Sequence, residues 1–213
     1  MIVLTRFKEL IVESLKDNKK WIIGLYILFI VVFIVAWLLS ANQANNLINN
    51  SAILRPNMSN PLSTSQVSAI DIFIINESSG ILTYIFSVFF GIPAFVSLLY
   101  NGVNLGVVGQ LFSALIPNGA LRYIVYLIPH GIFEITALII ESVAGILLFR
   151  FIWNFIKAWR SDETQGISDS FEKNKKLLIQ SIILMIFSTL LLLIAAPIEV
   201  YFSVPFSEFI LGV

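Results

Sequence analysis

Long runs of apolar residues dominate the chain, and each is long enough to cross a membrane as a helix. The stretch 21–40, WIIGLYILFIVVFIVAWLLS, has no charged residue, and about twenty apolar residues span the ~30 Å hydrocarbon core of a bilayer. The stretches 80–100 and 177–197 repeat this pattern. The first run is too long for a cleavable signal peptide and lacks a small-residue cleavage site. The pattern therefore predicts an all-α, polytopic membrane helical bundle.

The middle of the chain has a less regular pattern. Residues 102–116 give a run of only about 22 Å as a helix, whereas residues 120–149 are too many for one straight span. Pro129 and Gly131 interrupt the longer stretch, and proline removes a helical hydrogen bond. We therefore predict about five membrane helices, with a short third helix, a turn, and a fourth helix broken at Pro129–Gly131. A re-entrant hairpin over 102–128 is an alternative with the same sidedness.

Composition and the placement of charge extend this interpretation. The chain is 58% hydrophobic and 12% charged, with a mean hydropathy of +0.91, whereas a soluble domain is about 25% charged. All lysines and arginines except Arg55 and Arg122 lie in residues 1–20 and 150–176, which the positive-inside rule places in the cytoplasm. We expect one multi-pass domain of the cell membrane, with the N-terminus cytoplasmic and the C-terminus outside. The predicted segments of this domain, 1–213, are the cytoplasmic helix 1–20, the membrane helices 21–40, 80–100, 102–116, 130–149 and 177–197, the outside loop 41–79 and the cytoplasmic loop 150–176.

The residue inventory excludes several kinds of function. The chain has no cysteine, which excludes disulfides, thiol catalysis and thiolate metal ligands. Its formal net charge is zero, so no electrostatic attraction to nucleic acid is expected. No nucleophile, base and acid occur in a catalytic arrangement. We therefore expect a protein that is not an enzyme and has no cofactor.

Two segments outside the predicted spans carry patterns of their own. Residues 2–17 place apolar side chains at helical spacing opposite charged ones, which is typical of an interfacial helix on the inner leaflet. Packing of this helix on the protein's own cytoplasmic loop is the alternative. The predicted loop 41–79 contains Asn-x-Ser sequons, which indicate either a glycosylated surface loop or only an Asn- and Ser-rich composition. The sequons are at Asn49, Asn57 and Asn76.

The motif NGVNLGVVG, residues 101–109, combines glycines on neighbouring helical turns with two amides. Small residues about four positions apart let helix backbones approach closely in lipid. We expect this face to pack against another helix and to mediate self-association, with a ligand site at the broken helix as the alternative. The predicted packing residues, including two on the fourth span, are Gly102, Gly106, Gly109, Gly131 and Gly145.

The fourth span carries ionisable residues on one face. His130, Glu134, Ala137, Glu141 and Gly145 follow helical spacing, so this face must point into the protein. One histidine and two carboxylates spread along the helix make a poor ligand set, so no metal is expected. A structural polar network is our first interpretation, and a proton or ion path is the second. The residues of this network are Asn101, Asn104, His130, Glu134 and Glu141.

Two pairings follow from these positions. We expect Glu134 to be buried and to form a hydrogen bond with His130, one turn away, or with Asn101 or Asn104. Glu199 follows the last predicted span, and we expect it to pair with Arg122, because both are predicted to be on the outside.

The polar motifs together resemble those of the stage II sporulation protein M family, a group of small polytopic membrane proteins of bacteria and archaea. The matching motifs are NGVNLGVVG, PHGIFEITALIIESVAG and IEVYFSVP, and Asn76 also fits. The PHG...E element is the most specific, and the resemblance covers about residues 1–205. It implies five spans, which favours the short third helix over a re-entrant hairpin.

The resemblance also implies a class of function. Sporulation members of the family act in engulfment as a membrane scaffold for peptidoglycan-degrading partners. The Ile- and Asn-rich composition and the sequons favour an archaeal source, for which only the general scaffold role carries over. We therefore expect a non-enzymatic scaffold or assembly subunit that self-associates, as a dimer, in the lipid bilayer with other membrane or envelope proteins. A small transporter or channel that uses Asn101, Glu134 and Glu141 is the alternative.

Overall fold

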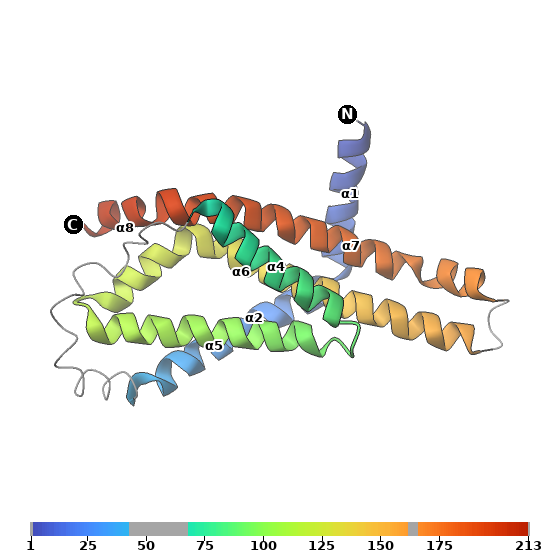
Figure 1. Ribbon diagram of the computed structural model, residues 1–213, viewed down its shortest axis with the longest axis horizontal. Helices are drawn as coiled ribbons and strands as arrows, with labels where there is room; N and C mark the ends of the chain where they lie inside the picture. Colours follow the sequence, from blue (N-terminus) through green and yellow to red (C-terminus); the bar gives the residue numbers. More distant parts are fainter. Residues whose placement is uncertain (1, 43–67, 162–165, 213) are drawn as a thin grey trace. The chain divides into compact units, whose positions relative to one another are not determined.

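The computed structural model describes residues 2–42, 68–161 and 166–212, and these contain helices and no strands. Five of the helices are long and apolar enough to cross a membrane, so the chain is an all-α, multi-pass membrane protein. Figure 1 labels the elements in chain order. They are α1 (Ile2–Asp17), α2 (Lys19–Leu39), α4 (Ala69–Phe86), α5 (Ile92–Leu115), α6 (Gly119–Trp159), α7 (Ile167–Ile198), η2 (Glu199–Ser203) and α8 (Val204–Leu211).

The chain forms two compact units. Unit 1 contains Met1–Tyr26, Glu77–Leu98 and Thr136–Leu191, and unit 2 contains Ile27–Asn76, Leu99–Ile135 and Leu192–Val213. The boundaries fall inside α2, α4, α5, α6 and α7, so each of these helices contributes one part to each unit.

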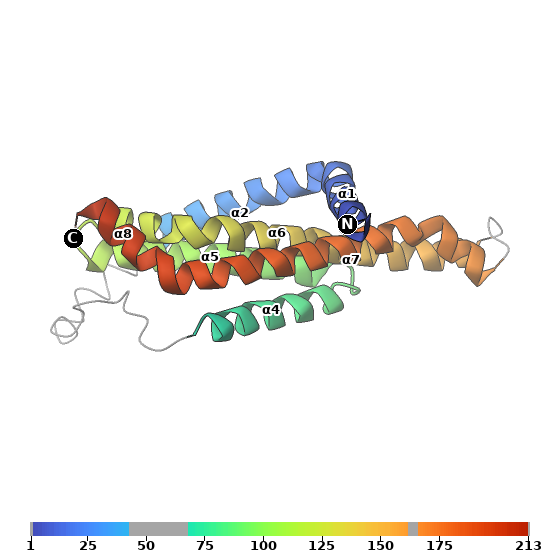
Figure 2. The same cartoon turned by 90° about the horizontal axis from the view of Figure 1, so that it is seen from above.

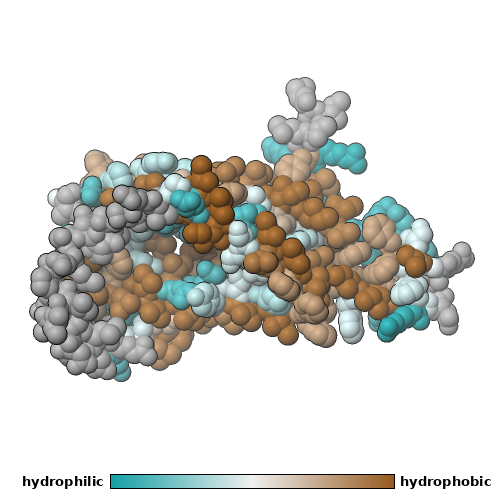
Figure 3. All heavy atoms as spheres, viewed as in Figure 1, coloured by the Kyte–Doolittle hydropathy of each residue, from teal (hydrophilic) through white to brown (hydrophobic). Residues whose placement is uncertain are grey.

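The surface of the helices is largely apolar. Large side chains such as Ile27, Leu38 and Ile132 are more than half exposed, and brown, hydrophobic residues dominate the face in Figure 3. Hydrophilic residues gather on α1 and near the α6–α7 connection in the same view. A soluble protein rarely exposes apolar area on this scale, whereas a bilayer solvates it.

The start of α4 is fixed by a capping box. Ser68 Oγ accepts a hydrogen bond from the backbone N–H of Asp71 at 3.1 Å, and Asp71 Oδ2 accepts one from the backbone N–H of Ser68 at 3.2 Å. This reciprocal pair satisfies donors that the first turn of a helix leaves free. The second membrane helix therefore begins at Ala69. The prediction that the outside loop continues to residue 79 was wrong, because its last residues are helical. Asn49 and Asn57 lie outside the described residues.

A tight turn separates α4 from α5. Phe90 and Gly91 both have positive φ, 61° and 67°, and Gly91 N–H donates to the carbonyl of Ser87 at 2.9 Å. Pro93 follows in the first turn of α5, where its missing N–H costs no helical hydrogen bond. The stretch 80–100 is thus the end of one helix and the start of the next. The predicted second and third spans were wrong in their bounds, and the third helix is not short.

The fourth membrane helix is longer than predicted. The chain turns at Pro117 and Asn118, as expected, and Asn118 has a φ of 56°. From there α6 runs through Gly119–Trp159 as one helix with Pro129 inside it. The predicted break at Pro129–Gly131 is therefore wrong. The helix continues through Pro129 and lacks only the backbone hydrogen bond that proline cannot donate. Residues 102–128 belong to α5 and α6, each long and apolar enough to cross a membrane, which disfavours a separate re-entrant hairpin.

Within unit 1, polar contacts hold α1 against the first part of α7. Asn18 Nδ2 donates to Gln180 Oε1 at 3.3 Å, and Lys176 Nζ lies 3.0 Å from Glu13 and 2.8 Å from Asp17. The hydrogen bonds from Lys176 and Gln180 lower the pKa of the Asp17 carboxyl below its ordinary value. Figures 1 and 2 both show α1 projecting crosswise to this part of α7.

Candidate functional site

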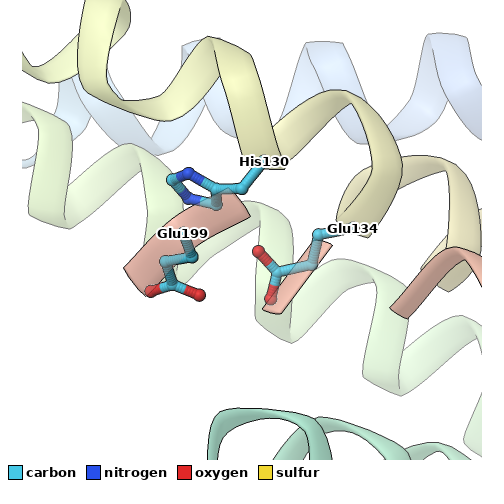
Figure 4. Close-up of side chains that lie close together, drawn as sticks. All are labelled: His130, Glu134 and Glu199. Carbon is cyan, nitrogen blue, oxygen red and sulfur yellow. The ribbon is translucent and has the colours of Figure 1, made fainter. Parts of the chain in front are cut away.

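Four polar residues from two segments of unit 2 face one another. His130 and Glu134 lie one turn apart on α6, and Glu199 and Ser203 lie at the two ends of η2. One ligand atom each from His130, Glu134 and Glu199 lies within 4.8 Å of the other two. Figure 4 shows the three side chains close together, two from α6 and one from η2. We call these three residues the His–Glu–Glu cluster.

The local backbone of η2 explains how Glu199 reaches this cluster. Residues Glu199–Ser203 form a π-helix between α7 and α8. Pro197 precedes this segment and Pro205 follows it, and neither proline can donate a backbone hydrogen bond. The Ser203 hydroxyl donates to the carbonyl of Ile198, five residues earlier, at 3.1 Å. Such π-turns occur frequently at functional sites, and this one turns Glu199 and Ser203 to the same side.

Hydrogen bonds hold two members of the cluster from outside it. His130 Nδ1 lies 2.8 Å from Ser203 Oγ, and Asn76 Nδ2 of α4 donates to Glu134 Oε1 at 3.0 Å. The ring of Tyr126 meets that of His130 edge-on, with the centroids 5.2 Å apart. The His130 side chain is only 4% exposed, and Ser203 is fully buried. The imidazole is therefore fixed by packing as well as by hydrogen bonding.

These contacts correct two predicted pairings and the predicted location of Asn76. The carboxylate of Glu134 accepts its hydrogen bond from Asn76, so the prediction of His130, Asn101 or Asn104 as its partner was wrong. Asn76 lies in a helix with its amide engaged, so its place in an outside loop was also wrong. Within the described residues Arg122 and Glu199 form no ion pair, and Glu199 lies beside His130 instead.

The other predicted network residues lie elsewhere. Asn101 is half-buried on α5, whereas Asn104 is exposed on the same helix. Glu141 is buried at 3% exposure but belongs to unit 1. The predicted face of α6 is therefore divided between the two units.

Glu141 lies in a second acidic group. Its carboxylate is close enough to that of Glu77 for the two to interact electrostatically. Thr189 of α7 donates to Glu77 Oε1 at 2.7 Å, while the described residues give the buried Glu77 Oε2 no hydrogen-bond partner. A Cβ on Gly80 would overlap the Glu141 carboxylate, so a larger residue there would require the Glu141 side chain to shift. Sequence reasoning missed Glu77 because it was assigned to the outside loop.

The glycines of the 101–109 motif face another helix of the same chain. A Cβ on Gly102 would lie 3.0 Å from Val32, one on Gly106 2.9 Å from Ala36, and one on Gly109 would overlap Trp37. Close backbone packing is thus confirmed, but α2 covers this face. Packing within the chain therefore accounts for this face, and the self-association expected of the protein stays a prediction.

The two predicted packing glycines of α6 differ from each other. A Cβ on Gly145 would lie 2.7 Å from Ser87 Oγ and 3.4 Å from Ala94, so the turn between α4 and α5 packs closely against Gly145. At Gly131 the nearest atoms belong to Leu127 and Ile135 of the same helix. Only Gly145 therefore makes the close contact expected of it.

The sequence carried a signal for the residues that were missed. Pro197 falls inside the last apolar run and is followed by Glu199 and Ser203, and a proline there predicts a local departure from α-helix. The family model for stage II sporulation protein M matches residues 25–204. The chain belongs to this family.

A relative extends the match to the archaea. The uncharacterized protein MJ0793 of Methanocaldococcus jannaschii is 31% identical over 186 residues, which cover 87% of this chain and 97% of that protein. No solved structure matches the chain. The match to the family covers α4 to η2, so the His–Glu–Glu cluster lies within the region that defines it.

Proposed function

We propose that the protein is a non-enzymatic membrane assembly subunit that self-associates through the exposed side of α5. Asn104 supports this proposal. It lies midway along α5 with its side chain exposed, and the described residues offer its amide no hydrogen bond. An amide at the centre of a membrane helix needs a polar partner, because lipid offers none. A second copy of the chain supplies the same amide at the same depth.

The neighbours of Asn104 form a suitable contact face. Tyr100, Val103 and Val108 are exposed on α5 beside it, at 65%, 43% and 40%. The glycine side of α5 is occupied by α2, so this second side is the one left for another subunit. A two-fold axis through Asn104 would pair the two amides, which favours a dimer.

The cellular setting of the proposal follows from the charges. We place the protein in the cell membrane with its N-terminus and residues 150–176 in the cytoplasm and its C-terminus outside. The basic N-terminal segment, the turn after α4 and the α6–α7 connection all belong to unit 1, which supports a common side. On that side α1 projects crosswise to α7, as a helix on the inner leaflet would. Other membrane or envelope proteins would bind to this scaffold.

The test compares the mass of the protein in detergent with that of two variants at one position. Asn104→Leu removes the amide, whereas Asn104→Gln keeps it. We expect wild type and Asn104→Gln to run as a dimer by multi-angle light scattering, and Asn104→Leu to shift toward the monomer with an unchanged melting temperature. Ile124→Leu, on the exposed side of α6, is the control for a lipid-facing change. If Asn104→Leu forms dimers over the same range of protein concentration as the wild type, the proposed interface is refuted.

A second candidate function is a small cation or proton carrier. The observation that supports it is the buried Oε2 of Glu77 beside Glu141, because unpartnered acids in membrane helices commonly mark ion pathways. Glu141→Gln should then abolish cation flux into liposomes without lowering the melting temperature. Gly24→Ala, a change in open space on α2, should leave flux intact. Equal flux through Glu141→Gln and wild type would remove this candidate.

A further inference from the structure

We propose that His130, Glu134 and Glu199 form a binding site for one divalent transition-metal ion, with Zn²⁺ as the best fit. The ligand atoms of the three residues lie within 4.8 Å of one another, and three protein ligands bound to one zinc ion at about 2.0–2.2 Å lie within that separation. The inference does not depend on the scaffold or on the carrier, because it concerns only what this cluster binds.

The tautomer of His130 is the one that a metal requires. The Ser203 hydroxyl has one hydrogen, which it donates to the carbonyl of Ile198 at 3.1 Å. Ser203 Oγ therefore accepts at 2.8 Å from His130, which places the imidazole hydrogen on Nδ1. Nε2 is left with a free lone pair, and the described residues give it no hydrogen bond. A histidine ligand in proteins is oriented in this way, by a bond from its other nitrogen.

The carboxylates are arranged for the same purpose. Asn76 binds Glu134 at Oε1, which leaves Oε2 for an ion and fixes the rotation of the carboxylate. The described residues donate no hydrogen bond to Glu199, the only one of the three that no side chain orients. Two carboxylates this close in membrane-spanning helices repel each other unless a cation or protons neutralise them. One dication would neutralise both.

The donor set selects the class of ion. An imidazole with two carboxylates suits Zn²⁺ and Mn²⁺, whereas Mg²⁺ and Ca²⁺ prefer sites built wholly of oxygen. Three protein ligands leave a fourth position for water or for a group from another molecule. The low exposure of His130 excludes bulk water from one side of the site.

The test measures metal content and stability on the whole chain, purified in detergent without a polyhistidine tag. Protein stripped with chelator and then dialysed against Zn²⁺ should retain one zinc per chain by mass spectrometry. Its melting temperature should rise with Zn²⁺ and not with Mg²⁺, because an ion that binds only the folded state stabilises it. Wild type that retains no zinc and shows no shift would overturn the proposal.

Variants separate this site from adventitious binding. Glu199→Gln should lose the retained zinc and the shift, while Glu141→Gln, in the other acidic group, should keep both. Should Glu199→Gln fail to fold, Glu199→Asp keeps the charge but shortens the ligand and should lower zinc affinity. Ser203→Ala touches no ligand atom of the ion and should weaken binding about 10–100-fold through loss of the bond to His130. Wild-type zinc affinity in both Glu199→Asp and Ser203→Ala would place the zinc elsewhere.

Discussion

Asn76 of α4 donates a hydrogen bond to Glu134 of α6 over 3.0 Å, across 58 positions of sequence. It is a long-range polar contact within unit 2, between two candidate membrane helices. In lipid such a contact has no competing water, and the acceptor is an acid that needs a donor. The pair is therefore a direct means of examining what Glu134 does for the fold.

The first prediction concerns this pair. Asn76→Leu should lower the free energy of unfolding by about 1–3 kcal/mol, because it leaves a half-buried carboxylate without its donor. Glu134→Gln should be mild, since the glutamine Oε1 can still accept from Asn76. Denaturation in detergent measures both. In the double variant Asn76→Leu/Glu134→Leu the loss of stability should be smaller than the sum of the losses in Asn76→Leu and in Glu134→Leu. Strict additivity would mean that the hydrogen bond contributes nothing.

The second prediction concerns the glycine side of α5. Gly106→Ala should destabilise the protein by about 1–3 kcal/mol, because the added Cβ would overlap the backbone carbonyl of Phe33, which cannot move aside as a side chain can. Gly24→Ala is the matched control, since the described residues beyond its own stretch of helix backbone place no atom within 4 Å of the added Cβ. It should be neutral or stabilising, by up to about 1 kcal/mol from helix propensity. Equal melting temperatures for the two variants would show that α2 and α5 are not packed this closely.

The third prediction tests sidedness. The chain has no cysteine, so Ser63→Cys and Ser161→Cys each give a single reactive thiol. A thiol reagent that cannot cross membranes should label position 63 in intact cells, and position 161 only after lysis. Labelling of position 161 alone in intact cells would invert the topology, which rests on the placement of lysine and arginine.

The fourth prediction concerns pH and α1. The pKa of Asp17 is lower in the folded protein than its ordinary 3.8, because Lys176 and then Gln180 donate to the carboxylate. The contact therefore stabilises the folded state above pH 3.8 and is lost as the pH falls through the lower, folded pKa. A fluorophore at Thr5→Cys should gain mobility, measured as a fall in anisotropy, on acidification through this range. The gain should be smaller in Asp17→Asn, and a wild-type response there would assign the change to another group.

Much of the fold could be predicted from the sequence, for identifiable reasons. Apolar run length and the charge distribution led to an all-α protein with five membrane helices, which the structure confirms. The bounds failed at α4 because SAID, residues 68–71, reads as a capping box only when the helix start is sought outside the most apolar window. They failed at the next turn because Gly91 and Pro93 lie inside an apolar run that hydropathy treats as continuous.

The site was harder to predict than the fold. His130 and Glu134 share a face because they are four residues apart, and that needs no structure. Glu199 joins them only through the packing of two distant segments and a π-turn, neither of which periodicity reveals. As part of a sequon, Asn76 is predicted to lie in a loop, whereas in α4 its amide donates to Glu134. Spacing thus found two of the three residues of the cluster, and tertiary contact supplied Glu199.

The π-helix of Glu199–Ser203 also bears on how members of the family differ in length. A turn closed by a bond to the fifth residue holds one residue more than an α-turn, and each residue of an α-helix advances about 100° around the axis. Removal of one residue here would rotate α8 by about that angle relative to α7 and would turn either Glu199 or Ser203 away from His130. Relatives that lack one residue at this point should therefore also lack the histidine or one of the carboxylates of the cluster. The absence of one residue in η2 would then mark an inherited loss of the site.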